Sequence, residues 1–583
     1  KTGAGTLTLS GSNTHSNTVI NGGAVQVSSD ANLGAAPGAF TAGNLALDGG
    51  TLRFGANFDI SNNRGITVGA GGGTIDTQGF TNPSGYTQAN GIQGSGSLTK
   101  MGSGVFFMNT PAGQLNTGWT GNLILKEGTW KISERGGLPA NPSTSGPVIA
   151  EQITFDGGAL QIAGSIPSVT NGRRGITVAA GGGTFDTQGF TFNWAGPLAG
   201  NVTSAVLTKI GSGTLQFNTN AVPAPSTYAG NFNVEEGTLV INGGGAMGDL
   251  AAVNLVNPVT PLIVQLTISG AAETIGSLSG GGADGGNATL NASLVTGGNN
   301  NSTIFNGRMS GAGGLTKTGS GTFTLAPAPS LGGNSYSGGT TVAGGTLLVM
   351  NTTGSSTGAG PVVVNSGATL GGTGAIQGSV TSSGAVAPGT SVGTLNLTGN
   401  YAQTSGGTLL IQIDSSGSDK LAVAGSLTLD GALEVSLADD YVPEAGDEFD
   451  VLDWSGALNT EFAHVSFDPL PDGLSWDDSR LYDEGVLAID GNFSAADFDE
   501  DADVDGDDLT RWRNNFATGT THMQGDADGD NDADGADFLV WQRQLGSPPS
   551  AIAANAPVPE PATLVLLVAG ALPMFFRRRP AVS

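Results

Sequence analysis

KTGSGTFTL, residues 317–325, is one of four related nonapeptides that decide how this chain folds. The others are KTGAGTLTL at 1–9, KMGSGVFFM at 100–108 and KIGSGTLQF at 209–217. Their lysines lie 99, 109 and 108 residues apart. A longer segment, RGITVGAGGGTIDTQGFT at 64–81, returns as RGITVAAGGGTFDTQGFT at 174–191, an offset of 110. A sequence that repeats itself at such intervals predicts an array of similar units instead of one globular core.

The repeated units have the pattern of short strands separated by tight turns. Glycine supplies 99 of the 583 residues, and pairs of glycines allow the positive φ that corners require. Strands this short cannot hold a sheet alone, but strands stacked coil upon coil pair their backbones about 4.8 Å apart and bury a continuous apolar row. Turn signals about every 8–12 residues favour a parallel β-helix with coils of ~20–25 residues. Sandwiches or a barrel fit the same pattern, because strand direction is not visible in a sequence.

These units resemble the autotransporter-associated β-strand repeat, also called the passenger-associated transport repeat, of large bacterial surface proteins. The resemblance rests on LTKTGSGTF at 315–323 and NSYSGGTTVAGGTLLV at 334–349, which the first copy varies as NTHSNTVINGGAVQV at 13–27. Residues 362–401 resemble the terminal coils of the same proteins. We therefore expect a mainly β fold, with an elongated parallel β-helix (solenoid) over residues 1–430 and an acidic, β-rich cap over 431–493.

The negative charge of the chain is concentrated near its C-terminal end. The formal net charge is −28, and residues 431–546 hold 30 of the 48 acidic side chains. Acidity of this kind argues against binding of nucleic acid. The absence of cysteine excludes disulfides, thiolate metal sites and a cysteine nucleophile. The chain opens inside a repeat, without Met or a signal peptide, and we interpret it as a fragment or a processed product.

The predicted β-helix offers no obvious catalytic cluster. Polysaccharide-cleaving chemistry needs carboxylates, or aspartate with arginine or lysine, crowded on one face. The candidate carboxylates are instead distributed one per motif, at Asp48, Asp76, Asp156 and Asp186. We expect Asp76 and Asp186, which stand beside glycine-rich turns, to stabilise those turns. The β-helix is therefore predicted not to be an enzyme.

The remaining chemically versatile side chains of the array also favour structural roles. The three histidines, His15, His464 and His522, lie in unrelated segments and predict neither a triad nor a zinc site. His15 stands where other copies have Tyr228 and Tyr336, which indicates a packing position. Lysines recur with the coil, and we expect them to be solvated edge charges that discourage sheet aggregation; they are Lys100, Lys209 and Lys317.

Two acidic segments share one spacing of carboxylates. DFDEDADVDGDD at 497–508 and DADGDNDADGAD at 526–537 both place aspartates at positions 1, 3, 5, 9 and 12, and position 7 adds a backbone carbonyl. This is the oxygen spacing of a twelve-residue calcium loop. A register starting at Asp501 is rejected, because it puts Leu509 and Trp512 where oxygen ligands are needed. We predict two Ca²⁺ sites, formed by Asp497, Asp499, Asp501, Asp503, Asp505 and Asp508 and by Asp526, Asp528, Asp530, Asp532, Asp534 and Asp537.

A helical stripe follows each loop. Spacings of three and four residues place apolar side chains on one face, so that the two loop–helix units can pack together; the stripes are Leu509, Trp512, Phe516 and Phe538, Trp541, Leu545. The duplicated unit, about residues 494–546, resembles a type I dockerin, the module that docks onto cohesin domains. The resemblance implies calcium binding and a cohesin-type partner.

The dockerin-like segment departs from its family at two places. Position 6, commonly glycine, is Ala502 and Asn531, and alanine is strained in the left-handed turn that asparagine tolerates. Positions 10 and 11 in dockerins help to choose the cohesin and are often Ser-Thr. Here they are Gly506-Asp507 and Gly535-Ala536, so calcium binding carries over from the family better than the cohesin-type partner does.

The C-terminal tail has the order of a sorting signal. After a linker at 547–557, residues 558–583 contain Pro559, Glu560 and Pro561, an apolar run of fifteen residues over 562–576, and Arg577, Arg578 and Arg579. As a helix, this run would be about 22 Å long, short of a ~30 Å hydrocarbon core. A buried core helix is the plain alternative, but the arginines favour membrane retention with their charges cytoplasmic.

The same order resembles the PEP-CTERM sorting signal of Gram-negative bacteria, which implies removal by an exosortase-type enzyme and transient inner-membrane retention. We predict a non-enzymatic, exported cell-surface or extracellular-matrix protein, similar to planctomycete-like surface proteins, with a calcium-dependent docking module. The alternative is a β-helical enzyme that acts on extracellular polysaccharide and is attached through the dockerin-like module. Scattered carboxylates and a polar ladder on the coils favour the first function, whereas acids, arginines and aromatics crowded on one face favour the second.

Overall fold

The computed structural model describes residues 1–88, 91–143, 145–167, 172–218, 224–258, 262–438, 441–471, 473–491 and 493–546. The chain forms two compact units. The first comprises residues 1–443, 447–469 and 476–488, and the second comprises 444–446, 470–475 and the chain from residue 489 onward. The solenoid lies in the first unit and the paired acidic loops lie in the second.

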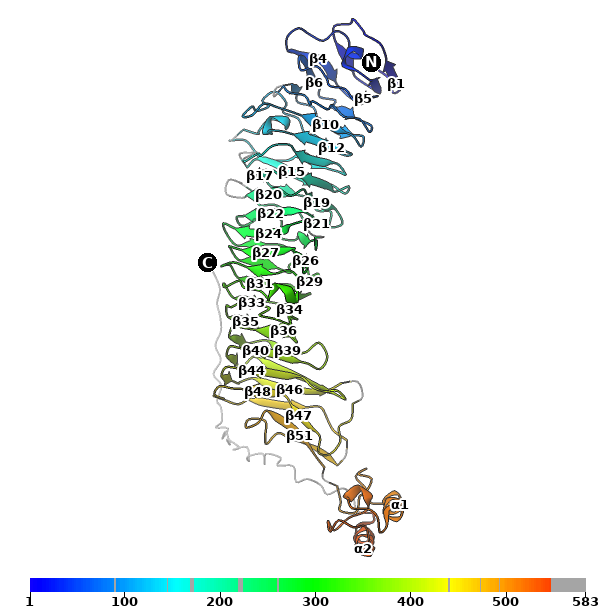
Figure 1. Ribbon diagram of the computed structural model, residues 1–583, viewed down its shortest axis with the longest axis vertical. Coiled ribbons are helices and arrows are strands. Elements are labelled where there is room, and N and C mark those ends of the chain that lie inside the picture. The colour runs from blue at the N-terminus through cyan, green and yellow to red at the C-terminus, as the bar shows by residue number, and fades with distance from the viewer. Residues whose placement is uncertain are drawn as a thin grey trace, which may run out of the picture. The chain divides into compact units, whose positions relative to one another are not determined.

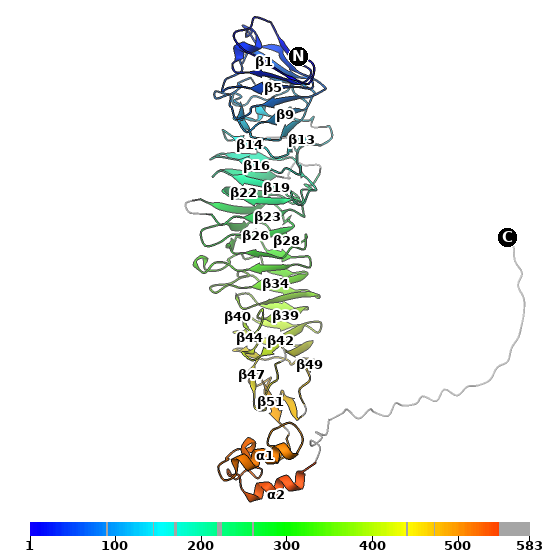
Figure 2. The ribbon, with the colours of Figure 1, turned by 90° about the vertical axis from the view of Figure 1, so that its right-hand side faces the viewer.

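The first unit is a parallel β-solenoid whose short strands stack coil upon coil (Figure 1, Figure 2). Its longest sheet has 17 strands. In sheet order they are β10 (Val105–Met108), β12 (Thr129–Ile132), β14 (Ala159–Ile162), β16 (Gly183–Asp186), β19 (Val206–Ile210), β21 (Asn231–Val234), β23 (Ala252–Leu255), β26 (Ser277–Gly280), β29 (Thr303–Phe305), β32 (Thr322–Leu325), β34 (Gly345–Val349), β36 (Ala368–Gly372), β39 (Ala385–Pro388), β42 (Thr408–Asp414), β43 (Gly417–Ser418), β46 (Ala432–Leu437) and β49 (His464–Phe467).

Five further parallel sheets form the other faces of the solenoid. The two at the N-terminal end are β1 (Thr6–Leu9), β3 (Ala24–Val27), β5 (Gly50–Phe54), β7 (Gly73–Asp76), β9 (Leu98–Met101), β11 (Leu123–Leu125), β13 (Ile149–Phe155), β15 (Arg174–Val178), β18 (Leu198–Ala199); and β2 (Thr18–Ile20), β4 (Thr41–Leu47), β6 (Arg64–Val68), β8 (Ile92–Gly94). The others are β17 (Thr191–Trp194), β20 (Thr214–Asn218), β22 (Gly237–Asn242), β24 (Val264–Ser269), β27 (Asn287–Leu290), β30 (Met309–Ser310); β25 (Glu273–Thr274), β28 (Leu294–Thr296), β31 (Leu315–Lys317), β33 (Thr340–Val342), β35 (Val362–Val364), β38 (Val380–Ser382), β41 (Tyr401–Gln403), β45 (Leu427–Thr428); and β37 (Ala375–Ile376), β40 (Thr394–Leu397), β44 (Lys420–Val423), β48 (Leu452–Trp454).

Parallel pairing between successive coils excludes the sandwich and barrel alternatives for this unit. β46 and β49 pair in parallel as well, so the stack continues beyond residue 430, the predicted boundary of the cap. A small three-stranded sheet then follows, made of β47 (Glu448–Asp450), β51 (Val486–Gly491) and β50 (Leu474–Asp477), in which β47 and β51 are antiparallel. Three 3₁₀ helices lie at corners of the solenoid: η1 (Asp30–Leu33), η2 (Arg135–Gly137) and η3 (Pro329–Leu331).

The core of the solenoid consists of rows of apolar side chains that lie one above another. Leu215, Leu239 and Leu266 are register partners on three successive strands, and all three are fully buried. Each buried leucine contributes about 1.5–3 kcal/mol of hydrophobic stabilisation. Because side chains alternate along a strand, the residues between them face outward, which explains why the sequence alternates so regularly.

The repeat lysines are buried, so the prediction that they are solvated edge charges is wrong. Lys100 lies in an inward row between Ile75 and Leu125 and is 0% exposed. Its Nζ donates hydrogen bonds to the carbonyls of Gly102, at 2.7 Å, and Glu127, at 3.1 Å. Glu127 belongs to the next coil, so the ammonium ties two coils together. Lys209 and Lys317 are equally buried and bond in the same way.

His15 also departs from its predicted packing role. It is exposed, whereas Tyr228 and Tyr336 are fully buried. The ring of His15 instead lies 2.9 Å from the hydroxyl of Thr18. His15, Tyr228 and Tyr336 therefore lie in different environments, although they occupy the same position in their copies of the repeat.

In its described residues the second unit contains two α-helices, α1 (Gly506–Asn515) and α2 (Gly535–Gln544), and the short η4 (His522–Gln524). Its core is small: Ala496, Phe498, Val504 and Trp541 are buried, and Leu509, Trp512, Ala527, Phe538 and Val540 pack against them. Each helix is preceded by one of the two acidic segments, which form the candidate site.

Candidate metal centre

Each acidic segment is a loop that runs directly into its helix. Asp505 is the N-cap of α1, and its side chain accepts a hydrogen bond from the backbone N–H of Asp507 at 2.7 Å. Asp534 is the N-cap of α2 and accepts from Ala536 at 2.6 Å. An aspartate at this place satisfies a free N–H group and favours the helix N-terminus electrostatically. Position 9 of each loop therefore fixes where the helix begins.

The aspartate at position 12 of each loop is fully buried and holds the loop closed. Asp508 accepts hydrogen bonds from the backbone N–H groups of Asp499, at 3.1 Å, and Asp505, at 2.8 Å. Asp537, also fully buried, accepts the equivalent hydrogen bonds from the backbone N–H groups of Asp528, at 3.2 Å, and Asp534, at 2.7 Å. Positions 3, 9 and 12 are thus brought together by the same bonds in both loops.

Position 1 is tied in the same way to the sixth residue of its loop. Asp497 is fully buried and its Oδ2 accepts from the backbone N–H of Ala502 at 3.0 Å. Asp526, 6% exposed, accepts from Asn531 at 2.9 Å. These bonds wrap each loop around its own first carboxylate.

The loops gather carboxylate oxygens within 4.8 Å of one another, in two groups per loop. The groups are Asp497, Asp499, Asp508; Asp503, Asp505, Asp508; Asp526, Asp528, Asp537; and Asp532, Asp534, Asp537. Position 7 contributes a side-chain oxygen to these groups, where the sequence suggested only a backbone carbonyl. Asp501 and Asp530, at position 5, belong to none of them, and each accepts from the N–H of position 7 at 3.2 Å. Clustered hard oxygen donors of this kind suit a divalent cation such as Ca²⁺.

One oxygen of the first loop is a buried acceptor without a hydrogen-bond donor. Oδ1 of Asp499 is shielded from solvent and accepts no hydrogen bond among the described residues. An ionised oxygen in such a place is unfavourable unless a positive charge compensates it. Burial and the neighbouring Asp508 carboxylate raise the pKa of Asp497 to about 6, and the same two causes raise the pKa of Asp499 to about 6. A bound cation would therefore offset the repulsion between these carboxylates, and the oxygen donors suit such an ion.

Both loops turn through left-handed conformations at positions 4 and 6. Position 6 has φ of 74° at Ala502 and 68° at Asn531. Position 4 has φ of 57° at Glu500 and 77° at Gly529. The first loop has Glu500 and Ala502 at these positions, and neither residue type favours a left-handed backbone as glycine and asparagine do. The first loop is therefore the more strained of the two. The strain at position 4 was not foreseen from the sequence.

The two loop–helix units are joined by a reciprocal pair of hydrogen bonds. Nε1 of Trp541, on α2, donates to the carbonyl of Asp505 at 2.8 Å, and Nε1 of Trp512, on α1, donates to the carbonyl of Asp534 at 2.8 Å. The rings of Trp512 and Phe538 stack with centroids 5.0 Å apart. Each helix thus donates a hydrogen bond to position 9 of the opposite loop.

The predicted apolar stripes are correct in part. Leu509, Trp512, Phe538 and Trp541 contribute to the shared core, but Phe516 and Leu545 are 49% and 53% exposed. Both are C-cap residues with non-helical backbone. Because each helix ends one residue before them, both side chains are about half exposed, although the ring of Phe516 still packs edge-on against Trp512 with centroids 5.1 Å apart.

The four candidate carboxylates of the solenoid accept hydrogen bonds from backbone N–H groups. Asp76 and Asp186 accept from the backbone N–H of Gln78, at 3.0 Å, and Gln188, at 2.9 Å, as the turn prediction requires. Asp48 and Asp156 accept from Gly71 and Gly181 of the next coil. These aspartates therefore connect turns and coils.

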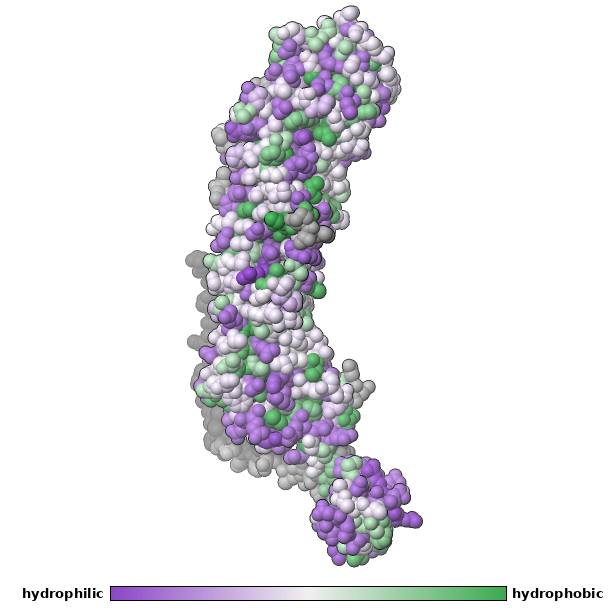
Figure 3. Space-filling view, in the orientation of Figure 1, coloured by the Kyte–Doolittle hydropathy of each residue, from purple (hydrophilic) through white to green (hydrophobic). Residues whose placement is uncertain are grey.

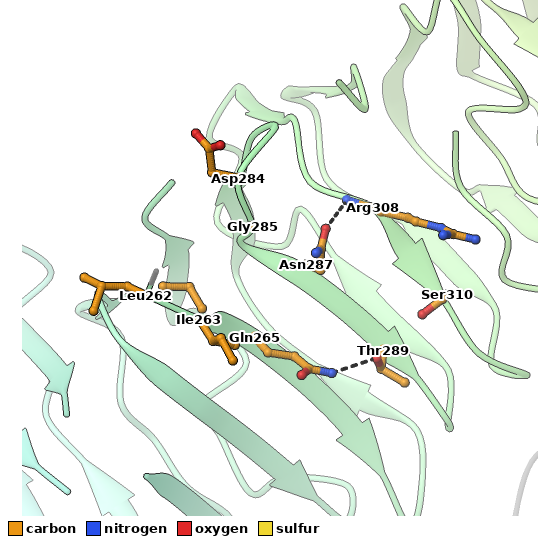
Figure 4. Close-up of a pocket in the computed structure, with 10 residues that line it drawn as sticks. Leu262, Ile263, Gln265, Asp284, Gly285, Asn287, Thr289, Arg308 and Ser310 are labelled. Atoms are coloured by element: carbon orange, nitrogen blue, oxygen red, sulfur yellow. Dashed lines mark hydrogen bonds between the residues drawn. The ribbon is translucent and has the colours of Figure 1, made fainter. Parts of the chain in front are cut away.

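A surface groove of about 470 Å³ lies beside β24, β27 and β30 (Figure 4). Gln265 donates to the hydroxyl of Thr289 at 3.1 Å, and the side chain of Asn287 accepts from the backbone N–H of Arg308 at 2.8 Å (Figure 4). Asp284 is the one carboxylate among the described residues that line it. A paired-carboxylate mechanism needs two such groups, so the described lining does not supply one.

The predicted sorting residues Pro559, Glu560, Pro561, Arg577, Arg578 and Arg579 lie outside the described residues, as does the linker. Among the residues that are described, no helix is both long enough and apolar enough to cross a membrane.

Comparison with known proteins identifies the repeats. The model of the passenger-associated transport repeat matches residues 1–27, 207–241 and 315–349. The chain is 31% identical over 285 residues to the adhesin BmaC autotransporter of Brucella suis biovar 1 (strain 1330), which is 48% of this chain and 8% of that protein. It is 35% identical over 131 residues to an extracellular serine protease of Serratia marcescens, which is 22% of this chain and 12% of that protein.

The chain thus spans a small part of the length of either relative. Among solved structures, the Hap adhesin of Haemophilus influenzae aligns with 80% of this chain and 63% of its own chain, at 12% identity and a TM-score of 0.26. The matches to the repeat model fall on the lysine corners of three copies and on the strands that follow them.

Proposed function

We propose that this chain is a non-enzymatic, exported cell-surface or extracellular-matrix protein. Its β-solenoid serves as a rigid spacer and contact surface, and its two acidic loops bind two Ca²⁺ ions to form a docking module. The passenger-associated repeats and the adhesin among the relatives support the surface role. The match to the protease spans 22% of this chain, against 48% for the adhesin, and we do not carry the protease activity over.

The observation that carries this proposal is the uncharged polar ladder on the outside of the coils. Thr191, Thr214 and Thr238 are register partners that face outward on β17, β20 and β22. On the same sheet Asn242 donates to Asn218 at 2.7 Å across coils. Such ladders stabilise stacked strands and supply hydroxyl and amide groups for contact, but no ionisable pair for catalysis.

The surface also lacks one large apolar patch on the face that Figure 3 shows, where hydrophobic residues form small, separate areas. Exposed apolar areas of that size are ordinary for a soluble surface. Contacts made by these coils would therefore be polar, of the kind that suits extracellular polysaccharide.

Calcium binding is supported by the buried carboxylates of the two loops. Asp497 and Asp508, like Asp526 and Asp537, face one another at short range inside a small core. A bound divalent cation would convert their repulsion into ligation, so that the free energy of binding becomes free energy of folding. By resemblance to dockerins, the partner of this module is a cohesin-type domain.

Calorimetric titration of the chelator-treated full chain with Ca²⁺ tests the metal sites. We expect two sites, of which the loop with Asn531 binds at least as tightly as the loop with Ala502. Asp508→Ala and Asp537→Ala should each remove one site. Asp507→Ala, at exposed position 11, is the matched control and should keep both. Absence of calcium-dependent heat, or two sites remaining in either position-12 variant, would overturn this part of the proposal.

Export is the second part of the proposal. We infer that the tail retains the chain transiently at the inner membrane and is removed near Pro559 by an exosortase-type enzyme. The intact mass of the mature native protein should then lack Arg577, Arg578 and Arg579. A mature protein that keeps these arginines would contradict the processing step.

A further inference from the structure

The surface groove beside β24, β27 and β30 continues into two further hollows. The second hollow, of about 420 Å³, has Ser335, Gln377 and Thr398 in its lining. The third, of about 220 Å³, lies beside β40, β44 and β48. Arg308 of the first hollow donates from Nη2 to the hydroxyl of Ser335 at 2.9 Å, and Thr398 lines both the second and the third. The three hollows therefore meet, and together they are called the axial groove below.

Backbone pairing places the axial groove on one column that crosses successive coils. Gln265 is the register partner of Asn287, and Figure 4 shows Gln265, Thr289 and Ser310 on three successive strands of this column. Parallel pairing also links β37, β40, β44 and β48. Backbone N–H to carbonyl bonds of 2.7–2.9 Å link the coils between β30 and β37: Ser335 to Met309, Asn334 to Ser355, and Ser356 to Ala375. At about 4.8 Å per coil, the column from β24 to β48 is on the order of 40 Å long.

Uncharged groups line most of the axial groove. Between Arg308 in the first hollow and Asp453 in the third, the described lining residues carry no charge. The carboxylate of Asp453 lies 3.8 Å from the ammonium of Lys420. Small residues leave the space of the second hollow: Gly332, Gly354, Ala359 and Ala375. The groove therefore offers amides, hydroxyls and short aliphatic groups to a ligand.

Building on the polysaccharide contact of the proposed function, we propose that the axial groove binds an extended, uncharged polysaccharide that lies along the column. Amide and hydroxyl side chains both donate and accept hydrogen bonds, as sugar hydroxyls do. Coils repeat about every 4.8 Å, so a polymer of similar units meets similar groups on one coil after another. The formal net charge of −28 disfavours polyanionic glycans at long range.

A polypeptide suits the axial groove less well. Peptides that bind a sheet through their backbone add as a further strand at a free edge. Along the groove, β24, β27, β40 and β44 are each paired on both sides. A chain that lies along the column also crosses these strands, so its contacts are made with side chains. Sugar hydroxyls satisfy such side chains without a strand edge.

Calorimetric titration of the full chain with cellohexaose, mannohexaose and chitohexaose, three straight and uncharged oligosaccharides, tests the axial groove. We expect at least one of them to bind, and its disaccharide to bind more weakly because it spans fewer coils. Gln265→Ala in the first hollow and Gln377→Ala in the second should each lower the affinity roughly 2- to 10-fold, since each removes an uncharged hydrogen-bonding group.

The controls separate the groove from the fold and from the rest of the surface. Gln377 is exposed, so Gln377→Ala should keep the wild-type melting temperature; it decides the matter if Gln265→Ala, which loses the bond to Thr289, is less stable. Gln114→Ala, an equal change at an exposed position outside the groove, should bind as the wild type does.

Three results would overturn the axial groove as a site for an uncharged polysaccharide. The first is a wild-type chain that binds none of the three hexasaccharides. The second is binding that Gln377→Ala does not weaken, which would leave the proposed polysaccharide contact in place on another face. The third is tighter binding of hexagalacturonate than of every uncharged hexasaccharide, which would assign the groove to acidic glycans. Calcium binding and export have separate tests and stand or fall independently.

Discussion

The lysine of each repeat shows how a single residue can hold a solenoid corner. Lys209 is fully buried, and its Nζ donates to the carbonyls of Gly211, at 2.6 Å, and Glu236, at 2.8 Å. Gly211 has φ of 79°, a conformation that glycine adopts without strain. Burial lowers the pKa of Lys209 to about 8, so the ammonium form persists at neutral pH. The lysine of the Lys-x-Gly motif thus links two successive coils through hydrogen bonds from its ammonium group.

Replacing this ammonium should destabilise the solenoid. Lys209→Met keeps the length of the side chain but leaves buried carbonyls without their donor, at a cost of roughly 1–3 kcal/mol. The midpoint of chemical unfolding, followed by circular dichroism, should fall accordingly. Lys126→Met is the control, because Lys126 is 49% exposed and pairs with Asp156 at the surface at 3.5 Å; its effect should stay within about 1 kcal/mol. Equal stability of the two variants would show that the buried ammonium group does not stabilise the contact between coils.

Glu273 gives the solenoid a pH dependence of defined sign. It is 1% exposed and accepts from the backbone N–H of Met247 at 2.8 Å. Burial raises its pKa from 4.5 to about 7, although backbone hydrogen bonds lower it in part. The folded state therefore holds a proton that the unfolded state releases between pH 4.5 and pH 7. The resulting stabilisation is complete below pH 4.5 and is lost as the pH rises through 7.

Glu273→Gln should remove this contribution to the pH dependence. The amide keeps an oxygen acceptor for Met247 and carries no charge at any pH. The loss of melting temperature between pH 5 and pH 8 should therefore be smaller in the variant than in the wild type. Glu434→Gln, at an exposed position of β46, should leave the wild-type loss unchanged. An identical pH profile for Glu273→Gln and the wild type would argue that Glu273 does not hold a proton in the folded state.

At the scale of elements, the reciprocal tryptophan bonds are the link between the two acidic loops. Trp541 fixes the carbonyl of Asp505 although it belongs to the helix of the other loop. Trp541→Phe keeps the ring stacking against Phe538 but removes this bond. We expect weaker calcium binding at the first loop, by a factor of several, and reduced coupling between the sites, measured by calorimetry. Leu539→Ala, at an exposed position of α2, should change neither. Unchanged binding in Trp541→Phe would show that the loops act separately.

The elements also show what the sequence could predict. Repeat spacing and alternation favoured a parallel stack over sandwiches or a barrel, and the twelve-residue spacing located both loops, because these are local patterns. The burial of Lys100 was within reach, since Leu98-Thr99-Lys100 alternates and places the lysine on the same face as the leucine. The reciprocal tryptophan hydrogen bonds and the side-chain oxygens of position 7 could not be predicted from the sequence. They depend on how two loops separated by 29 residues meet in space.

At the scale of the whole molecule, two units of opposite character share one chain. The solenoid holds rows of apolar side chains and few charges, so its stability should not depend on metal. The second unit has a core of a few side chains around carboxylates that repel one another. It should fold only when a cation compensates that repulsion. We therefore expect calcium to control the folding of the second unit and to leave the solenoid unchanged.

Hydrogen exchange of the full chain, followed by mass spectrometry with and without Ca²⁺, tests this claim most directly. In chelator, we expect the backbone amides of residues 494–546 to exchange within seconds while those of the solenoid core remain protected. In calcium, the helices α1 and α2 should become protected, and the solenoid should show no change. Equal protection of residues 494–546 in chelator and in calcium would contradict the account.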